Sequence, residues 1–131
     1  MKYLLDINTL IALGHTSHAH HTRATAWYSS VMGPDSALCT CAITELGFVR
    51  VSVQAGLQSD VVSARKALAA LKATSAIPFE LIGDSLGADR LPAFARTPPK
   101  LSDGHLFELA REHQARLATL DTGIPGAVVF P

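Results

Sequence analysis

Hydrophobic positions along the chain follow two different spacings. Short apolar runs, each four or five residues long and typical of buried strands, cover residues 2–5, 37–41, 79–82, 116–120 and 127–130. Between these runs, apolar residues recur at helical spacing over residues 8–13, 20–32, 43–53, 59–71 and 102–110. This alternation predicts an α/β fold, a three-layer α/β/α sandwich around a mostly parallel central sheet.

Polar and turn-forming residues divide these segments. Gly33-Pro34 ends the second helix, Ser59 is expected to cap the fourth helix with Asp60 in its first turn, and Ser102 is expected to cap the last. Residues 84–100 are irregular and hold one glycine and three prolines, which predicts a mobile or partner-facing segment with room for a short helix after Pro92.

Length and composition predict one globular domain over residues 1–131. The chain is 48% hydrophobic and 17% charged, and its longest apolar stretch near the start, residues 3–13, is interrupted by Asp6 and Asn8 and too short to span a bilayer. No basic segment precedes that stretch, so we expect neither a signal peptide nor a membrane anchor. Cys39 and Cys41 would share one face of a strand as free thiols, which suits a reducing cytoplasm. The sequence has no second cysteine pair to complete a structural zinc site.

The formal net charge is zero, with 11 Lys and Arg against 11 Asp and Glu. A nucleic-acid-binding domain usually carries a basic excess, so bulk charge gives that function no support. If four acids occupied one metal pocket, however, the remaining surface would carry 11 positive and 7 negative charges, a balance of +4. Neutrality therefore does not exclude a phosphate-backbone substrate.

Four scattered carboxylates are the candidate active centre: Asp6, Glu45, Asp103 and Asp121. Two of them follow predicted strands and two begin predicted helices, and one edge of a parallel sheet can bring such positions together. Glu45 and Asp103 have a structural alternative, because an acid in the first turn of a helix is favourable without any function. Asp6 and Asp121 are harder to explain in that way, because a carboxylate directly after a buried strand is costly unless it is solvated, paired or bound to a metal. Together they suit phosphodiester hydrolysis, since Mg²⁺ and Mn²⁺ prefer carboxylate oxygens and can activate water.

These acids lie in segments that resemble the PIN-domain family, and specifically the VapC toxins of bacterial toxin–antitoxin pairs. The matching segments are Leu-Leu-Asp-Ile-Asn-Thr-Leu-Ile at 4–11, Ile-Thr-Glu-Leu-Gly-Phe-Val-Arg at 43–50, Ser-Asp-Gly-His-Leu at 102–106 and Leu-Ala-Thr-Leu-Asp at 117–121. The resemblance implies a Mg²⁺- or Mn²⁺-dependent endoribonuclease that inhibits translation, a homodimer and a cognate antitoxin protein. It also implies supporting roles for Asn8 and Thr119, whereas Gly104 is an unfavourable residue so near a helix start.

Other side chains admit two interpretations. His15, His18, His20 and His21 are clustered, but no Cys or carboxylate lies near them in sequence to complete a metal site, so we expect them to be structural or to line the substrate path. Trp27 and Tyr28 could stack on bases or pack in the core, and Arg50 could contact phosphate or simply lie on the surface.

Parts of the sequence are similar to three other kinds of protein. A haloacid-dehalogenase-like phosphatase is disfavoured because Asn8 stands where that family has a second Asp, and no catalytic lysine motif or terminal acid pair follows. A receiver domain is disfavoured because no acidic pair closes the first strand. The remaining rival is a catalytically silent PIN-fold module that binds RNA or a partner, which would have little reason to hold all four acids together.

Overall fold

The central sheet is entirely parallel. The computed structural model describes residues 1–130, and within them five strands run in the order β3-β2-β1-β4-β5. The strands are β1 (Lys2–Leu5), β2 (Ala37–Thr40), β3 (Phe79–Leu81), β4 (Ala115–Thr119) and β5 (Val128–Val129). The predicted α/β fold with a mostly parallel sheet is therefore confirmed.

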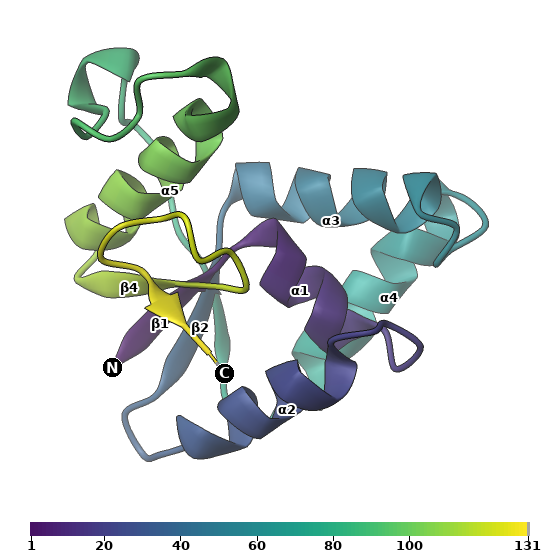
Figure 1. Cartoon of the computed structure of the whole chain (residues 1–131). Helices are drawn as coiled ribbons and strands as arrows, with labels where there is room; N and C mark the ends of the chain where they lie inside the picture. The colour runs from purple at the N-terminus through teal and green to yellow at the C-terminus, as the bar shows by residue number, and fades with distance from the viewer. Residues whose placement is uncertain (131) are drawn as a thin grey trace.

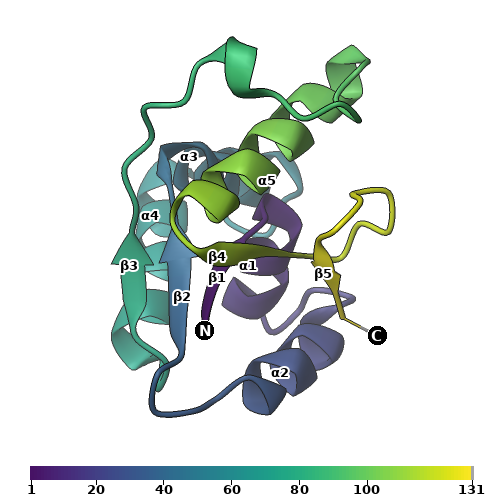
Figure 2. The same cartoon turned by 90° about the vertical axis from the view of Figure 1, so that its left-hand side faces the viewer.

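Helices cover both faces of this sheet. They are α1 (Ile7–Gly14), α2 (His21–Ser30), α3 (Ala42–Gln54), α4 (Val61–Thr74) and α5 (Leu101–Glu112), with two 3-10 turns at Ala88–Arg90 and Pro98–Lys100. Figures 1 and 2 show α5 on one face of the sheet, together with the segment before it, and the other four helices towards the opposite face. None of the helices within residues 1–130 is long and apolar enough to cross a membrane.

Alternation along the strands builds a separate core on each face. Leu5, Leu38 and Ala118 join the core under α1 to α4, while the neighbouring residues Leu4 and Leu117 join the core under α5. This is the two-residue period of a strand buried on both faces. The register places Leu5 opposite Ala118, so β1 and β4 end at the same edge of the sheet.

The cysteines lie as the sequence predicts. Cys39 and Cys41 are buried free thiols in the core beneath α5. Burial, the largest effect, raises the pKa of Cys39 to about 11, with the nearby Glu80 acting in the same direction. This thiol is therefore an inert packing group rather than a reactive one.

Two of the predicted helix caps are wrong. The cap of α4 is Asp60, whose carboxylate accepts the backbone N–H of Ser63 at 2.7 Å, and not Ser59. Helix α5 begins at Leu101, so Ser102 lies inside it without capping it. In both places a polar residue adjoins the true boundary, and the local sequence alone does not decide between neighbours.

The segment from residue 84 to residue 100 folds over the start of α5. It contains the two 3-10 turns, and the only helical structure between Pro92 and α5 is the second of them, Pro98–Lys100. A Cβ on Gly104 would lie 2.6 Å from the Cβ of Ala95, which is too close for two carbon atoms. Gly104, unfavourable by helix propensity, therefore lets this segment pack directly onto α5.

Candidate metal centre and active site

Asp6 stands where β1 passes into α1. One carboxylate oxygen, Oδ1, accepts the backbone N–H of Ile7 at 2.7 Å, so Asp6 caps α1 as well as ending the strand. The residue is only 7% exposed. Burial, the largest effect, raises the pKa of Asp6, and the Thr119 and Ile7 hydrogen bonds oppose that rise only in part.

The second carboxylate oxygen of Asp6 is held by the end of β4. Thr119 is fully buried, and its hydroxyl donates to Asp6 Oδ2 at 2.8 Å. The same hydroxyl accepts the side-chain amide N–H of Asn8 at 3.2 Å, and Asn8 Oδ1 accepts the backbone N–H of Leu120 at 3.1 Å. The contacts of Asn8 and Thr119 thus fix the orientation of one acid and tie α1 to the end of β4.

Asp121 lies just beyond the same strand. Its backbone N–H donates to the Thr119 hydroxyl at 3.0 Å, and its Oδ1 accepts the backbone N–H of Gly123 at 2.7 Å. These two bonds fold the chain into a turn that directs the carboxylate back towards Asp6, whose pKa the negative charge of Asp121 raises further.

Asp103 reaches the same place from the first turn of α5. Burial, the largest effect, raises the pKa of Asp103, and the charges of Asp6 and Asp121 add to the rise. Lys100 acts in the opposite direction, with its Nζ 4.0 Å from Asp103 Oδ2 and donating to the carbonyl of Gly123 at 3.2 Å. Three carboxylates from three parts of the sequence therefore repel one another at one point.

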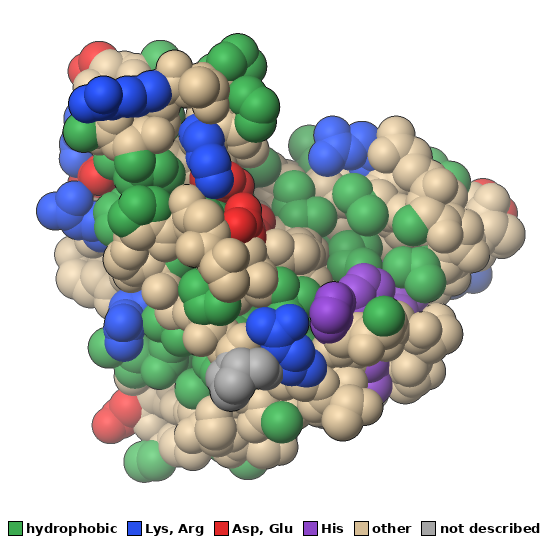
Figure 3. Space-filling view, viewed as in Figure 1, with side chains coloured by type: hydrophobic (Ala, Val, Ile, Leu, Met, Phe, Trp, Pro, Cys, Tyr) green, Lys and Arg blue, Asp and Glu red, His purple; other side chains and the backbone are tan. Residues whose placement is uncertain are grey.

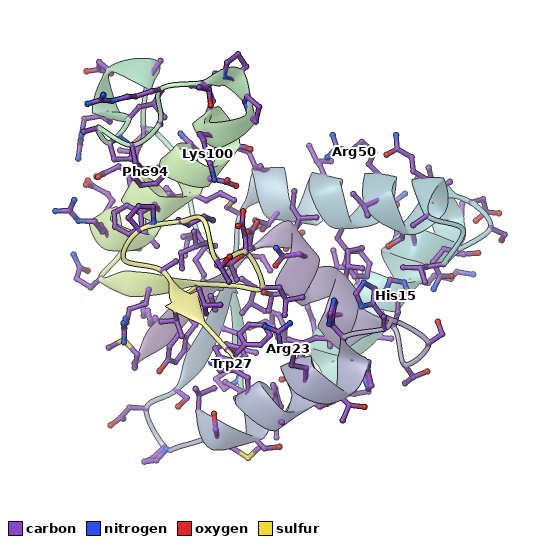
Figure 4. The ribbon with its side chains drawn as sticks, viewed as in Figure 1. His15, Arg23, Trp27, Arg50, Phe94 and Lys100 are labelled. Carbon is purple, nitrogen blue, oxygen red and sulfur yellow. The ribbon has the colours of Figure 1, made fainter. Side chains whose placement is uncertain are left out.

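These three acids line one hollow at the carboxyl edge of the sheet. Its volume is about 350 Å³, and its lining includes Asp6, Asp103, Asp121, Asn8 and Ser102. In Figure 3 acidic side chains are visible in the depression between α5 and α3, with a basic side chain directly beside them. Figure 4 shows Lys100 at the start of α5 and Arg50 on α3, on the two sides of that depression.

Glu45 is not part of this hollow. It lies in the first turn of α3, as predicted, but its Oε2 accepts the Thr40 hydroxyl at 2.5 Å and forms an ion pair with Lys72 of α4. It lines a different hollow, of about 390 Å³, between α3 and α4. The structure thus brings together three of the four predicted acids and holds the fourth against another helix.

The donor set of the acidic hollow suits a hard divalent cation. Its polar lining offers carboxylate, amide and hydroxyl oxygens, the ligands that Mg²⁺ and Mn²⁺ prefer. Within residues 1–130 no three His, Cys, Asp or Glu side chains form a ready-made metal cluster. Mg²⁺ commonly takes one or two carboxylates directly and keeps several waters, so the oxygen donors of this hollow suit it without a cluster of three direct ligands.

Sequence reasoning missed two contributors to this site. Lys100 carries the positive charge nearest Asp103, and the only signal for it was a lysine one turn ahead of the acid. Ser102, expected as a cap, lines the hollow instead. Both depend on where α5 begins, which the sequence left uncertain by one or two residues.

The four clustered histidines differ in their surroundings. His15 donates from Nδ1 to the carbonyl of Ile11 at 3.0 Å and stacks on Phe48, and His21 contacts the carbonyl of Ala12 at 2.8 Å. His18 lines the acidic hollow, whereas His20 is exposed and outside it. Two of the four are therefore structural, and one faces the site.

The aromatic residues of α2 are packing groups. Trp27 is 6% exposed and stacks on Phe130 with ring centroids 5.1 Å apart. The Tyr28 hydroxyl accepts the backbone N–H of Ala76 at 2.8 Å, which ties α2 to the end of α4. The Trp27 ring is therefore not available to stack on a base, and Tyr28 is a partly buried ring packed against the core.

The chain is similar to known proteins over nearly its whole length. A PIN domain family model matches residues 3–127. Among curated proteins, ribonuclease VapC38 of Mycobacterium tuberculosis is 36% identical over 124 residues, covering 92% of this chain and 86% of that protein. Ribonuclease VapC29 of the same organism is 36% identical over 125 residues, covering 95% and 89%.

Solved structures share the architecture at lower sequence identity. Mycobacterium tuberculosis VapC20, described as a toxin that cleaves the sarcin-ricin loop, superposes with a TM-score of 0.67 at 18% identity, covering 98% of this chain and 99% of that one. VapBC2 of Rickettsia felis, solved on a DNA fragment from its promoter, gives a TM-score of 0.65 at 13% identity, covering both chains completely. At these identities the likeness shows the fold alone.

Proposed function

The chain belongs to the PIN domain family and is homologous to VapC ribonucleases, and from this premise we propose that it is a Mg²⁺- or Mn²⁺-dependent endoribonuclease, the toxin of a toxin–antitoxin pair. The observation that carries the proposal is the convergence of Asp6, Asp103 and Asp121 on one hollow, where burial and mutual repulsion raise the pKa values of Asp6 and Asp103. Such an arrangement disfavours its own charge unless a cation joins it.

Each residue has a separate task in this proposal. Asp6, Asp103 and Asp121 would hold the metal, and Asn8 and Thr119 would keep Asp6 and Asp121 oriented towards it. The bound metal would activate a water and offset the negative charge of the scissile phosphate. Lys100, beside Asp103 at the rim, places a positive charge where phosphate oxygens would arrive.

Glu45 is the fourth acid implied by the family resemblance. It could reach the metal only after leaving Thr40 and Lys72, which hold its carboxylate against α4. We therefore include Glu45 in the proposed catalytic set as a group that joins on rearrangement, and not as a ligand already in position.

The partners and location follow from the same premise. The proposal takes residues 1–131 as one nuclease domain that forms a homodimer, acts on RNA in the cytoplasm and is held inactive by an antitoxin protein. The VapBC2 complex of Rickettsia felis supports an antitoxin partner. Translation would fall because RNA required for it is cut.

The test is cleavage of structured RNA by the purified protein. Cleavage should require Mg²⁺ or Mn²⁺ and stop with EDTA, and Asp6→Asn or Asp103→Asn should abolish it while circular dichroism stays unchanged. Induction in a bacterial host should block incorporation of labelled amino acids for the wild type but not for these variants. Full activity in EDTA, or in both variants, would reject the mechanism.

The second candidate is the catalytically silent binding module. It would bind RNA or a protein partner without turnover on any cellular RNA. The present location of Glu45, away from the three aspartates, is the observation in its favour. Sequencing the 5′ ends of cellular RNA after induction separates the two, because new ends appear only if the protein cuts.

A further inference from the structure

The acidic hollow continues beyond its carboxylates into an apolar region. The same hollow is lined by Ile7 and Ile11 of α1, Val51 of α3 and His18 of the connection between α1 and α2. In Figure 3 histidine side chains lie on the face that carries the acids, with hydrophobic side chains between the two groups. A cation held by the aspartates would leave this apolar region free.

His18 presents one defined hydrogen-bond donor to that region. Its Nδ1 accepts the backbone N–H of His20 at 3.0 Å, so the proton of the neutral ring must lie on Nε2. Desolvation, the largest effect, lowers the pKa of His18, and His20, His15 and His21 lower it further. The imidazole is therefore neutral near pH 7, an uncharged ring with a fixed N–H donor.

We propose that Ile11, Val51 and His18 form a subsite for one nucleobase of the RNA, next to the phosphate that is cut. The proposal rests on the proposed ribonuclease function and adds a base-recognition element to it. A phosphate beside the aspartates is joined through its sugar to a base. That base therefore lies within reach of the adjoining part of the hollow. Apolar walls suit its faces, and the Nε2–H donor suits an acceptor on its edge.

The charges around the hollow favour a base over another occupant. A carboxylate would be repelled by the three aspartates. A cationic side chain would be drawn to those aspartates, where the metal is proposed to bind, and not to Ile11, Val51 and neutral His18. A flat, uncharged group with acceptors at its edge meets neither difficulty. If a side chain of an antitoxin occupied this region instead, the antitoxin would compete with RNA for binding.

Two histidine variants provide a matched test. His18→Ala removes the ring from the hollow, while His20→Ala removes an exposed ring of the same cluster and keeps the backbone N–H that His18 accepts. Binding is measured by fluorescence anisotropy with short labelled oligoribonucleotides in Ca²⁺, each carrying one abasic residue at a successive position. RNA cleavage in the presence of Mg²⁺ and the affinity for Mn²⁺ are both measured on the same preparations.

One abasic position should weaken wild-type binding about ten-fold, the usual effect of losing one stacked base. The same position should cost less than about two-fold in His18→Ala, while His20→Ala keeps the wild-type profile and metal affinity is unchanged in all three. His18→Phe, which retains a ring but no donor, should keep affinity and lose preference among bases. Equal abasic profiles in wild type and His18→Ala, with RNA still cut, would overturn the subsite alone. If the wild type neither binds nor cuts RNA, the proposed function fails and the subsite with it.

Discussion

Asp103 is held in an environment that opposes its own charge. Burial first, and then the charges of Asp6 and Asp121, raise its pKa above the ordinary value of 3.8, and Lys100 offsets this only in part. Without metal, the folded protein therefore binds more protons than the unfolded chain between that value and the raised pKa. The free energy of unfolding should fall as pH rises through this interval, and the full loss is present at every pH above the raised pKa.

Asp103→Asn should therefore stabilise the metal-free protein at neutral pH. We expect its melting temperature in EDTA at pH 7 to rise by about 4 °C, the change that roughly 1 kcal/mol produces in a domain of this size. The gain should vanish below pH 3.8, where the carboxylic acid is neutral in both states. Excess Mg²⁺ should raise the melting temperature of the wild type and not of the variant.

The exposed residue Asp35 provides the control for this measurement. Asp35→Asn should leave the melting temperature and its response to Mg²⁺ unchanged. A neutral-pH melting temperature of Asp103→Asn below that of the wild type would mean that the carboxylate is a stabilising group, and that the repulsion among the three aspartates is already relieved without metal.

Glu45 illustrates a residue whose position was predictable and whose contacts were not. The apolar pattern after β2 placed it correctly in the first turn of a helix. Its side chain is directed by Lys72, which is 27 residues away on α4 and carries no sequence signal that links the two. The orientation of a long side chain at a helix start depends on tertiary neighbours, which one sequence does not reveal.

At the scale of elements, the pair formed by Glu45 and Lys72 links α3 to α4 and keeps the fourth acid away from the three aspartates. Lys72→Met should release Glu45 and raise the affinity for Mn²⁺ by about two- to five-fold, the free energy of one partly exposed ion pair. Adding Glu45→Gln to that variant should remove the gain. Isothermal titration calorimetry measures all three proteins.

Lys66→Met is the matched control, because Lys66 is an exposed residue of the same helix and lines a different hollow. It should leave Mn²⁺ affinity unchanged. If Lys72→Met also has the affinity of the wild type, Glu45 is a structural link between the two helices and not a group that joins the metal.

Elements and their order were the most predictable features of this chain. The alternating strand and helix patterns gave all five strands and five helices, because burial on one or both faces of an element leaves a period in the sequence. Caps were less predictable, as with Asp60 against Ser59. The close contact of α1 with α3 was not predictable, because it depends on the missing side chain of Gly47.

Gly47→Ala should destabilise the protein through that contact. A Cβ at this position would lie 2.2 Å from Cδ1 of Ile7, so the side chain of Ile7, which lines the acidic hollow, must move. Overpacking costs about 1–3 kcal/mol and exceeds the gain in helix propensity of about 1 kcal/mol. Urea denaturation should show a lower unfolding free energy, whereas Gly83→Ala, where a Cβ meets no atom within 4 Å, should show little change. A Gly47→Ala variant as stable as Gly83→Ala would mean that α1 and α3 can separate at no cost.

Across the whole molecule, positive and negative charges are equal in number but unevenly distributed. The net charge is zero, yet three carboxylates are gathered in one hollow with Lys100 beside them and Arg50 across from them. An RNA backbone approaching this hollow meets negative charge at the centre and positive charge only at the rim. We therefore expect RNA binding to depend on the divalent cation, and not on bulk electrostatics.

RNA affinity measured by fluorescence anisotropy should fall at least about ten-fold when Ca²⁺ is replaced by EDTA, because removing the cation exposes the phosphate to the three aspartates. The double variant Asp6→Asn with Asp103→Asn should bind RNA equally in both buffers, since it lacks most of the repulsion and most of the metal site. Affinity should also fall as salt rises, with a shallow slope set by the few rim cations. A wild-type affinity that is the same with and without Ca²⁺ would mean that RNA is held on another face, and the three aspartates would then have no direct part in binding it.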